Sequence, residues 1–105
     1  MTAADQLAYN RWFAAEAHER GLGVALKNDV EQVDELVGDF DFAINEQCFQ
    51  YDECEALLPF IEAGKAVLHV EYKRELSEFC PVTTDLGFSA MKKKLSLNAW
   101  RQPCP

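Results

Sequence analysis

Two glutamates, Glu46 and Glu71, stand near the ends of two consecutive apolar stretches of the chain. If these stretches form neighbouring strands, their backbones lie about 4.8 Å apart. Two carboxyl groups that close in a partly dry cleft shift each other's protonation, so that one stays protonated while the other stays charged. Hydrolysis of a glycosidic bond uses such a pair: one carboxyl protonates the leaving oxygen, and the other attacks or activates water. The spacing therefore favours acid–base chemistry at a sugar linkage.

Both glutamates also have a purely structural interpretation. Either could cap a loop amide or pair with Lys27, and the sequence leaves this alternative open. His69 is more typical of a histidine packed in the interior than of a catalytic base. Lys92-Lys93-Lys94 is the one basic cluster and is most simply a solvated rim.

Positioning these side chains at one edge requires a parallel sheet, and the chain alternates helical and extended patterns. We expect helices over residues 3–20, 30–37 and 52–63, and strands over residues 22–26, 40–46, 65–72 and 88–92. Three caps are expected at helix starts: Thr2 for the first helix, Asp29 for the second, and a capping box that begins at Asp52 for the third. Gly21 should end the first helix, and Gly64 should end the third. Pro59 should bend the third helix or delay its start.

The rest of the chain is less regular in pattern. Residues 73–87 contain Pro81 and Gly87 and predict an irregular loop with room for one helical turn. Residues 100–105 predict a docked tail. Strands that alternate with helices of about 10–15 residues indicate parallel βαβ units. The fold class is therefore α/β, a parallel (β/α) repeat with about four strands in a single domain over residues 1–105.

Polar residues follow the first three predicted strands, at the edge where parallel α/β folds bind ligands. They are Lys27, Asn28, Asp29, Asn45, Glu46, Gln47, Glu71 and Tyr72. The chain has no Gly-rich phosphate loop, so we expect no nucleotide and no other cofactor.

Composition narrows the possible partners. The 105 residues carry a formal net charge of −8, which argues against nucleic acid and is compatible either with a cationic partner or with simple solubility. No apolar run is long enough for a membrane span. The first residues lack the basic and apolar regions of a signal peptide.

The four cysteines are Cys48, Cys54, Cys80 and Cys104, and none of them form a Cys-x-x-Cys motif. We therefore expect no metal site. Their even number fits disulfides and an oxidising compartment, although four buried thiols are an alternative. Four cysteines allow three connectivities. We favour Cys48–Cys54 closing a short loop and Cys80–Cys104 fixing the tail.

Several stretches resemble the endo-α-1,4-polygalactosaminidases, glycoside hydrolase family 114. The similarity covers nearly the whole chain, and its most specific part is Asn45-Glu46-Gln47-Cys48-Phe49-Gln50-Tyr51. The other similar stretches are residues 5–12, 23–29, 59–67, 70–72, 78–81 and 86–88.

The resemblance implies a (β/α)₈ barrel that cleaves α-1,4-linked galactosamine polymers, in a secreted parent protein. Glu46 would match one of its two catalytic carboxylates, as general acid/base. Residues lining the cleft would be Lys27, Asn28, Asp29, Asn45, Gln47, Glu71 and Tyr72. The polymer is cationic, in keeping with an acidic chain.

The chain departs from this family in length. A complete barrel takes about 250 residues, so the resemblance covers only the last four strands, the C-terminal half of the barrel. The second catalytic carboxylate of the family lies upstream of the matching region. We therefore expect a half-barrel with two open sheet edges that is inactive alone. The alternatives are a carbohydrate-binding remnant and a structural unit that needs a partner, either the N-terminal half-barrel or a second copy.

Overall fold

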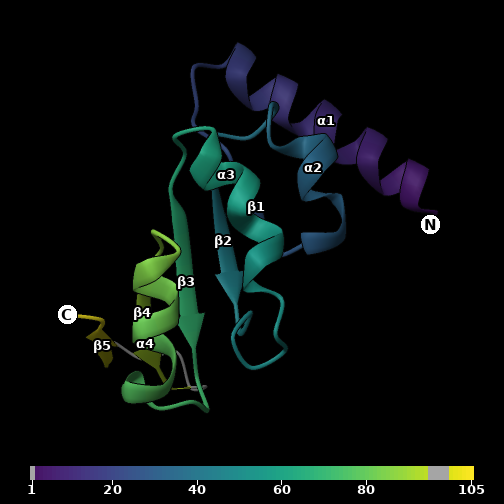
Figure 1. The fold of residues 1–105 in the computed structure, drawn as a ribbon. Coiled ribbons are helices and arrows are strands. Elements are labelled where there is room, and N and C mark those ends of the chain that lie inside the picture. The colour runs from purple at the N-terminus through teal and green to yellow at the C-terminus, as the bar shows by residue number, and fades with distance from the viewer. Residues whose placement is uncertain (1, 95–99) are drawn as a thin grey trace.

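The computed structural model describes residues 2–94 and 100–105. Helices and strands alternate along the chain (Figure 1). The helical elements are α1 (Ala3–Glu19), η1 (Val30–Gln32), α2 (Val33–Leu36), η2 (Cys54–Leu57), α3 (Leu58–Glu62) and α4 (Leu76–Asp85). The strands are β1 (Ala25–Lys27), β2 (Phe42–Glu46), β3 (Val67–Glu71), β4 (Ser89–Lys93) and β5 (Arg101–Pro103).

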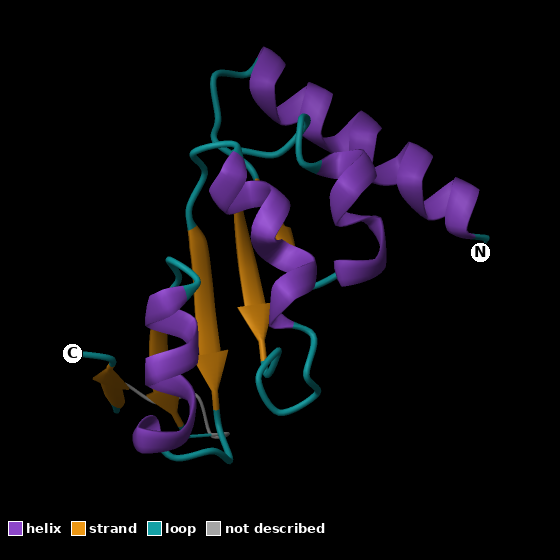
Figure 2. Ribbon diagram, in the orientation of Figure 1, coloured by secondary structure: helices purple, strands orange, loops and turns teal. Residues whose placement is uncertain are grey.

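The strands form one sheet in the order β1-β2-β3-β4-β5. β1 to β4 are parallel, and β5 runs antiparallel to β4. The predicted parallel α/β repeat of four strands is thus confirmed, and it is consistent with part of a (β/α)₈ barrel. The expectation of two open edges is wrong at one side, because the C-terminal tail occupies the outer edge of β4. Figure 2 shows α3 and α4 running alongside the strands, while α1 extends beyond them.

Three helix termini follow the predicted signals. Thr2 caps α1 in a reciprocal capping box, in which the Asp5 amide donates to Thr2 Oγ1 at 3.1 Å and the Thr2 amide donates to Asp5 Oδ2 at 3.2 Å. Gly21 and Gly64 follow α1 and α3 with φ of 73° and 74°, a conformation that glycine adopts without steric cost.

Two predicted caps are wrong. Asp29 makes no capping bond. It lies in the left-handed region and accepts a hydrogen bond from Asn10 Nδ2 at 3.1 Å, and the second helix is split into η1 and α2. The box predicted from Asp52 is absent, because Asp52 itself has φ of 56° and the chain enters η2 first. As Pro59 predicted, α3 begins late, with proline in its first turn.

The helix α4 was predicted as a loop, and that prediction is wrong. Its start is stabilised by Glu78, whose carboxylate accepts the Glu75 amide at 3.0 Å. Pro81 lies inside the helix, where it lacks an amide donor. Burial of Phe79, Cys80 and Thr83 on one side of α4 offsets this loss, so tertiary packing prevails over local propensity.

The main core lies between the sheet and the helices. Leu26, Ala43 and Val67 share one register row of β1, β2 and β3 and are buried. They belong to the same cluster as Leu36, Leu57 and Phe60 from the helical segments. The opposite face of the sheet carries the less buried side chains.

Both favoured disulfides are confirmed: Cys48 is bonded to Cys54, and Cys80 to Cys104. The second joins α4 to the residue after β5 and so holds the tail against the sheet. In the described part of the chain, no helix is both long and apolar enough to cross a membrane.

Lys65 connects the start of β3 to the segment before β2. Its ammonium donates to the carbonyl oxygens of Val37 at 2.6 Å and Phe40 at 2.8 Å, in a half-buried position. The two carbonyl oxygens thus have a hydrogen-bond donor where they would otherwise be removed from water without one.

We predict that Lys65→Met lowers the free energy of unfolding by about 1–3 kcal/mol, because two hydrogen bonds from a charged donor are lost. Urea denaturation measures this change. Lys73→Met, at an exposed lysine, is the matched control and should change stability little. Equal effects of the two substitutions would contradict the role of Lys65.

Candidate active site

The end of β2 divides its polar residues between the two faces of the sheet. In register, Asn45 pairs with His69 and Glu46 with Val70. Side chains alternate along a strand, so Glu46 shares a face with Val70, while Asn45, His69 and Glu71 share the opposite face. Asn45, His69 and Glu71 are all buried, whereas Glu46 is partly exposed. The helix-covered face therefore holds Glu71, and the open face holds Glu46.

Glu46 lies within a small polar cluster on the open face. Its Oε1 lies 3.0 Å from the Lys27 ammonium, and the Glu46 carboxyl retains 32% side-chain exposure. Tyr72 follows the end of β3, and its hydroxyl interacts with the Glu46 carboxyl. The pairing with Lys27 is the structural alternative that the sequence left open, and it leaves the carboxyl accessible from solvent.

Asn28 links the end of β1 to the end of β2 by hydrogen bonds. Its Oδ1 accepts the Glu46 amide at 2.8 Å, and Asn45 Nδ2 donates to the same oxygen at 3.4 Å. The Asn28 amide donates to the Ile44 carbonyl at 2.8 Å. With φ of 57°, Asn28 turns the chain out of β1 in a left-handed conformation that asparagine tolerates. The backbone of Glu46 is thereby fixed from the neighbouring strand.

The predicted carboxylate pair of Glu46 and Glu71 is wrong. The strands are neighbours as expected, but the two side chains point to opposite faces. The Glu71 side chain is fully buried, and its Oε2 accepts from the Phe49 amide at 2.9 Å and contacts His69 Nε2 at 2.5 Å. Glu71 therefore does not line the open face as the resemblance implied.

The other predicted site residues have distinct positions. Asn45 is buried, and its Oδ1 accepts the Cys48 amide at 2.8 Å, so it supports the loop after β2 from inside. Gln47 is partly exposed and in the left-handed region, with φ of 67°. Asp29 bonds to Asn10 and lines a hollow of about 300 Å³ between α1 and β1.

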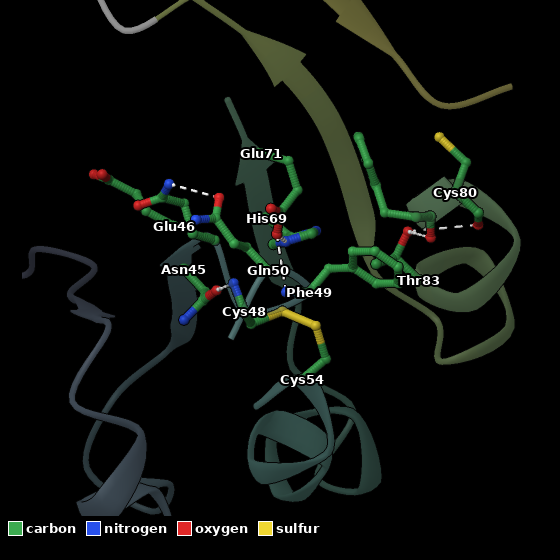
Figure 3. Close-up of polar contacts among 12 residues, drawn as sticks. Asn45, Glu46, Cys48, Phe49, Gln50, Cys54, His69, Glu71, Cys80 and Thr83 are labelled. Carbon is green, nitrogen blue, oxygen red and sulfur yellow. Dashed lines mark hydrogen bonds and ion pairs between the residues drawn. A yellow bond between two sulfur atoms is a disulfide. The ribbon is translucent and has the colours of Figure 1, made fainter. Parts of the chain in front are cut away.

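Sequence reasoning gave no separate role to Gln50 and did not foresee the contact between Phe49 and Glu71. Gln50 Oε1 accepts from Gln47 Nε2 at 3.2 Å (Figure 3). Their three-residue spacing, with Gln47 just before and Gln50 within the Cys48–Cys54 disulfide loop, was a usable signal. His69 and Glu71 are two residues apart on a strand, which by itself places both on one face.

One group of potential metal ligands occurs beside this site. Sγ of Cys48, Sγ of Cys54 and a ring nitrogen of His69 lie within 4.8 Å of one another, and all three residues are buried. The two sulfurs form a disulfide and so offer no thiolate, which is the form that binds metal. His69 is instead packed edge-on against Phe79 and Phe88, as a histidine of the interior.

The pKa of the Tyr72 phenol depends on the charge of Glu46. Burial raises the pKa of the Tyr72 phenol above its ordinary value of 10.0, and the negative charge of Glu46 and its interaction with the hydroxyl raise this pKa further. The Tyr72 hydroxyl thus stays protonated through the neutral range and can donate a hydrogen bond beside Glu46.

We predict that Glu46→Gln lowers the pKa of Tyr72, because the neighbouring negative charge disappears while burial is unchanged. An NMR titration of the ring carbons measures this change. The signals of Tyr9 and Tyr51, which are exposed, serve as internal references. An unchanged Tyr72 titration in Glu46→Gln would show that the carboxyl does not face the phenol.

Comparison with known proteins gave a match to a solved structure and a match to a protein-family model. The chain is similar to the protein in the crystal structure of Aspergillus fumigatus Ega3 in complex with galactosamine, with a TM-score of 0.89 and 29% identity. The match covers 99% of this chain and 47% of that one, so this chain spans about half the length of its solved relative. A search of curated protein sequences gave no match. The protein-family model for glycoside-hydrolase family GH114 matches residues 1–105, and the chain therefore belongs to that family.

Proposed function

We propose that this chain forms the half of a glycoside hydrolase active site that carries the general acid/base, and that Glu46 is this residue. The observation that supports the role most strongly is the position of the Glu46 carboxyl. It lies on the open face, at the carboxyl ends of parallel strands, beside Lys27 and Tyr72. Catalytic groups of (β/α)₈ enzymes occupy this edge. Lys27, Asn28, Gln47 and Tyr72 would surround the bound sugar.

We propose a polymer of α-1,4-linked galactosamine as the substrate. The solved relative is complexed with galactosamine, an amino sugar that is cationic when protonated. The net charge of −8 gives this chain a field that attracts such a polymer. The two disulfides fit an oxidising compartment, and we propose that the parent protein acts outside the cell.

Hydrolysis by this mechanism needs a second carboxylate, and buried Glu71 does not provide one on the open face. We propose that the second carboxylate belongs to the other half of the barrel. Among the described residues, β1 pairs only with β2, so its outer edge is available for another strand. Tyr9, Trp12 and Phe13 on α1 are about half exposed, which is typical of a surface that another element covers.

The burial of Glu71 also supports a second candidate function, binding of the amino sugar without cleavage. A half site with one carboxylate could hold the polymer through Glu46 and the amides around it. Cleavage and binding assays on the same chain separate the two functions.

We predict that the 105-residue chain releases no reducing ends from polygalactosamine, since it carries one of the two carboxylates. It should bind galactosamine oligomers with an affinity that falls as salt is added, because exposed charges are screened. Reducing-sugar assays and calorimetry measure the two properties. Release of reducing ends by this chain would contradict the missing carboxylate.

In the complete enzyme, we predict that Glu46→Gln lowers kcat by about 10²–10⁴-fold, the usual contribution of a general acid/base. The circular dichroism spectrum should not change. Glu62→Gln, at an exposed glutamate at the end of α3, is the matched control. Turnover near the wild-type value in Glu46→Gln would refute the role of Glu46.

A further inference from the structure

Glu71 and His69 form a buried polar pair that contacts the loop following β2. Both side chains are fully buried, and Glu71 Oε2 accepts from the His69 ring and from the Phe49 amide (Figure 3). A carboxylate only accepts hydrogen bonds, so His69 Nε2 is the donor within the pair. The pair thus connects β3 to the backbone of the loop that begins one residue after Glu46.

Stability alone does not explain this pair. Among the described residues, neither Glu71 Oε1 nor His69 Nδ1 has a hydrogen-bond partner, although both atoms are buried. Buried polar groups are normally satisfied. Apolar residues of similar volume often replace a buried charged pair without loss of stability. The hydrogen bond from the Phe49 amide to Glu71 therefore points to a role of the pair in positioning the loop.

The loop is fixed at three successive points. The Gln47 amide donates to the Val70 carbonyl at 2.7 Å, the Cys48 amide to Asn45 Oδ1, and the Phe49 amide to Glu71. The disulfide from Cys48 to Cys54 then closes it. Gln47 sits in a left-handed conformation that is uncommon for its residue type. These constraints determine where the side chains of the loop lie.

Gln47 and Gln50 are the polar side chains that this arrangement brings together. Gln47 Nε2 donates to Gln50 Oε1, and each amide retains a second group, Gln47 Oε1 and Gln50 Nε2, with no hydrogen-bond partner in the part of the chain that the structure describes. The two groups offer one acceptor and one donor, the combination that a sugar hydroxyl can satisfy. Both residues are partly exposed.

We propose that Glu71 and His69 are positioning residues that hold Gln47 and Gln50 next to Glu46 as a subsite for the hydroxyl groups of the bound sugar. This inference rests on the proposed function for the identity of the ligand. The acidic carboxyl would attract the cationic amino group, and the amide pair would orient the neutral hydroxyls. Glu71 acts through the loop and does not touch the sugar.

The test compares three variants of the chain with a matched control. Glu71→Leu removes the acceptor of the Phe49 amide, Glu71→Gln keeps an acceptor without the charge, and Gln50→Ala removes one amide of the subsite. Thr83→Val removes another buried hydrogen bond, from Thr83 Oγ1 to the Phe79 carbonyl at 3.1 Å within α4. Hydrogen exchange of the Phe49 amide and the affinity for a galactosamine trimer are measured for each protein, together with global stability.

We expect Glu71→Leu to speed Phe49 exchange and to weaken trimer binding, each by about tenfold or more, since a hydrogen bond to a charged group is lost. Glu71→Gln should recover part of both. Gln50→Ala should weaken binding without changing Phe49 exchange. Thr83→Val should change neither, beyond its effect on global unfolding.

Three results would overturn the inference. The first is Phe49 exchange and affinity that are unchanged in Glu71→Leu, or changed equally in Thr83→Val. The second is unchanged affinity in Gln50→Ala. A wild-type chain that does not bind the trimer refutes the subsite together with the proposed function. If the trimer binds but Glu46→Gln leaves its affinity unchanged, the role of Glu46 in attracting the amino group fails, while the subsite is still decided by Gln50→Ala.

Discussion

Neighbouring side chains of a strand point to opposite faces of the sheet, and this alternation organises the polar edge of the molecule. The parallel register aligns Asn45 with His69, and Glu46 with Val70. Residues one position apart consequently have different environments. Glu46 reaches the open face with Lys27, while Glu71 is enclosed beneath the helices with His69. A shift of β2 by one residue would turn Glu46 to the helix-covered face and Asn45 to the open face, so the register is the constraint on which the candidate site depends.

The backbone at this edge is held in unusual conformations. Asn28, Asp29 and Gln47 all have positive φ and all lie just after β1 or β2. Such conformations cost free energy and persist only where surrounding contacts enforce them. Here the contacts are hydrogen bonds from the Asn28 amide to the Ile44 carbonyl, from Asn10 to Asp29, and from the Gln47 amide to the Val70 carbonyl. The result is a rigid frame around Glu46, of the kind that catalytic and binding groups require.

Much of this arrangement was accessible from the sequence. Apolar runs that end in polar residues predicted the parallel strands. The even cysteine count indicated disulfides, and the two favoured pairings among three possible connectivities are confirmed. The predicted pairing of Glu46 with Glu71 is wrong because it rested on the two strands being neighbours and ignored the direction of each side chain. The alternation of Val67, His69 and Glu71 along their strand already indicated that direction. The helix α4 was missed because Pro81 and Gly87 outweighed a burial pattern that only the tertiary fold reveals. The antiparallel pairing of β5 depends on contacts distant in sequence, and no local pattern encodes it.

Glu46 and Glu71 occupy opposite faces of the sheet, and we propose that only Glu46 contacts the ligand. Carbodiimide labelling of carboxyl groups, followed by mass spectrometry with and without galactosamine oligomers, distinguishes the two glutamates. We expect Glu46 to be labelled in the native chain and protected by the oligomer, and Glu71 to be labelled only after unfolding. Native labelling of Glu71 at the rate of Glu46, or labelling of Glu46 that the oligomer does not slow, would contradict this expectation.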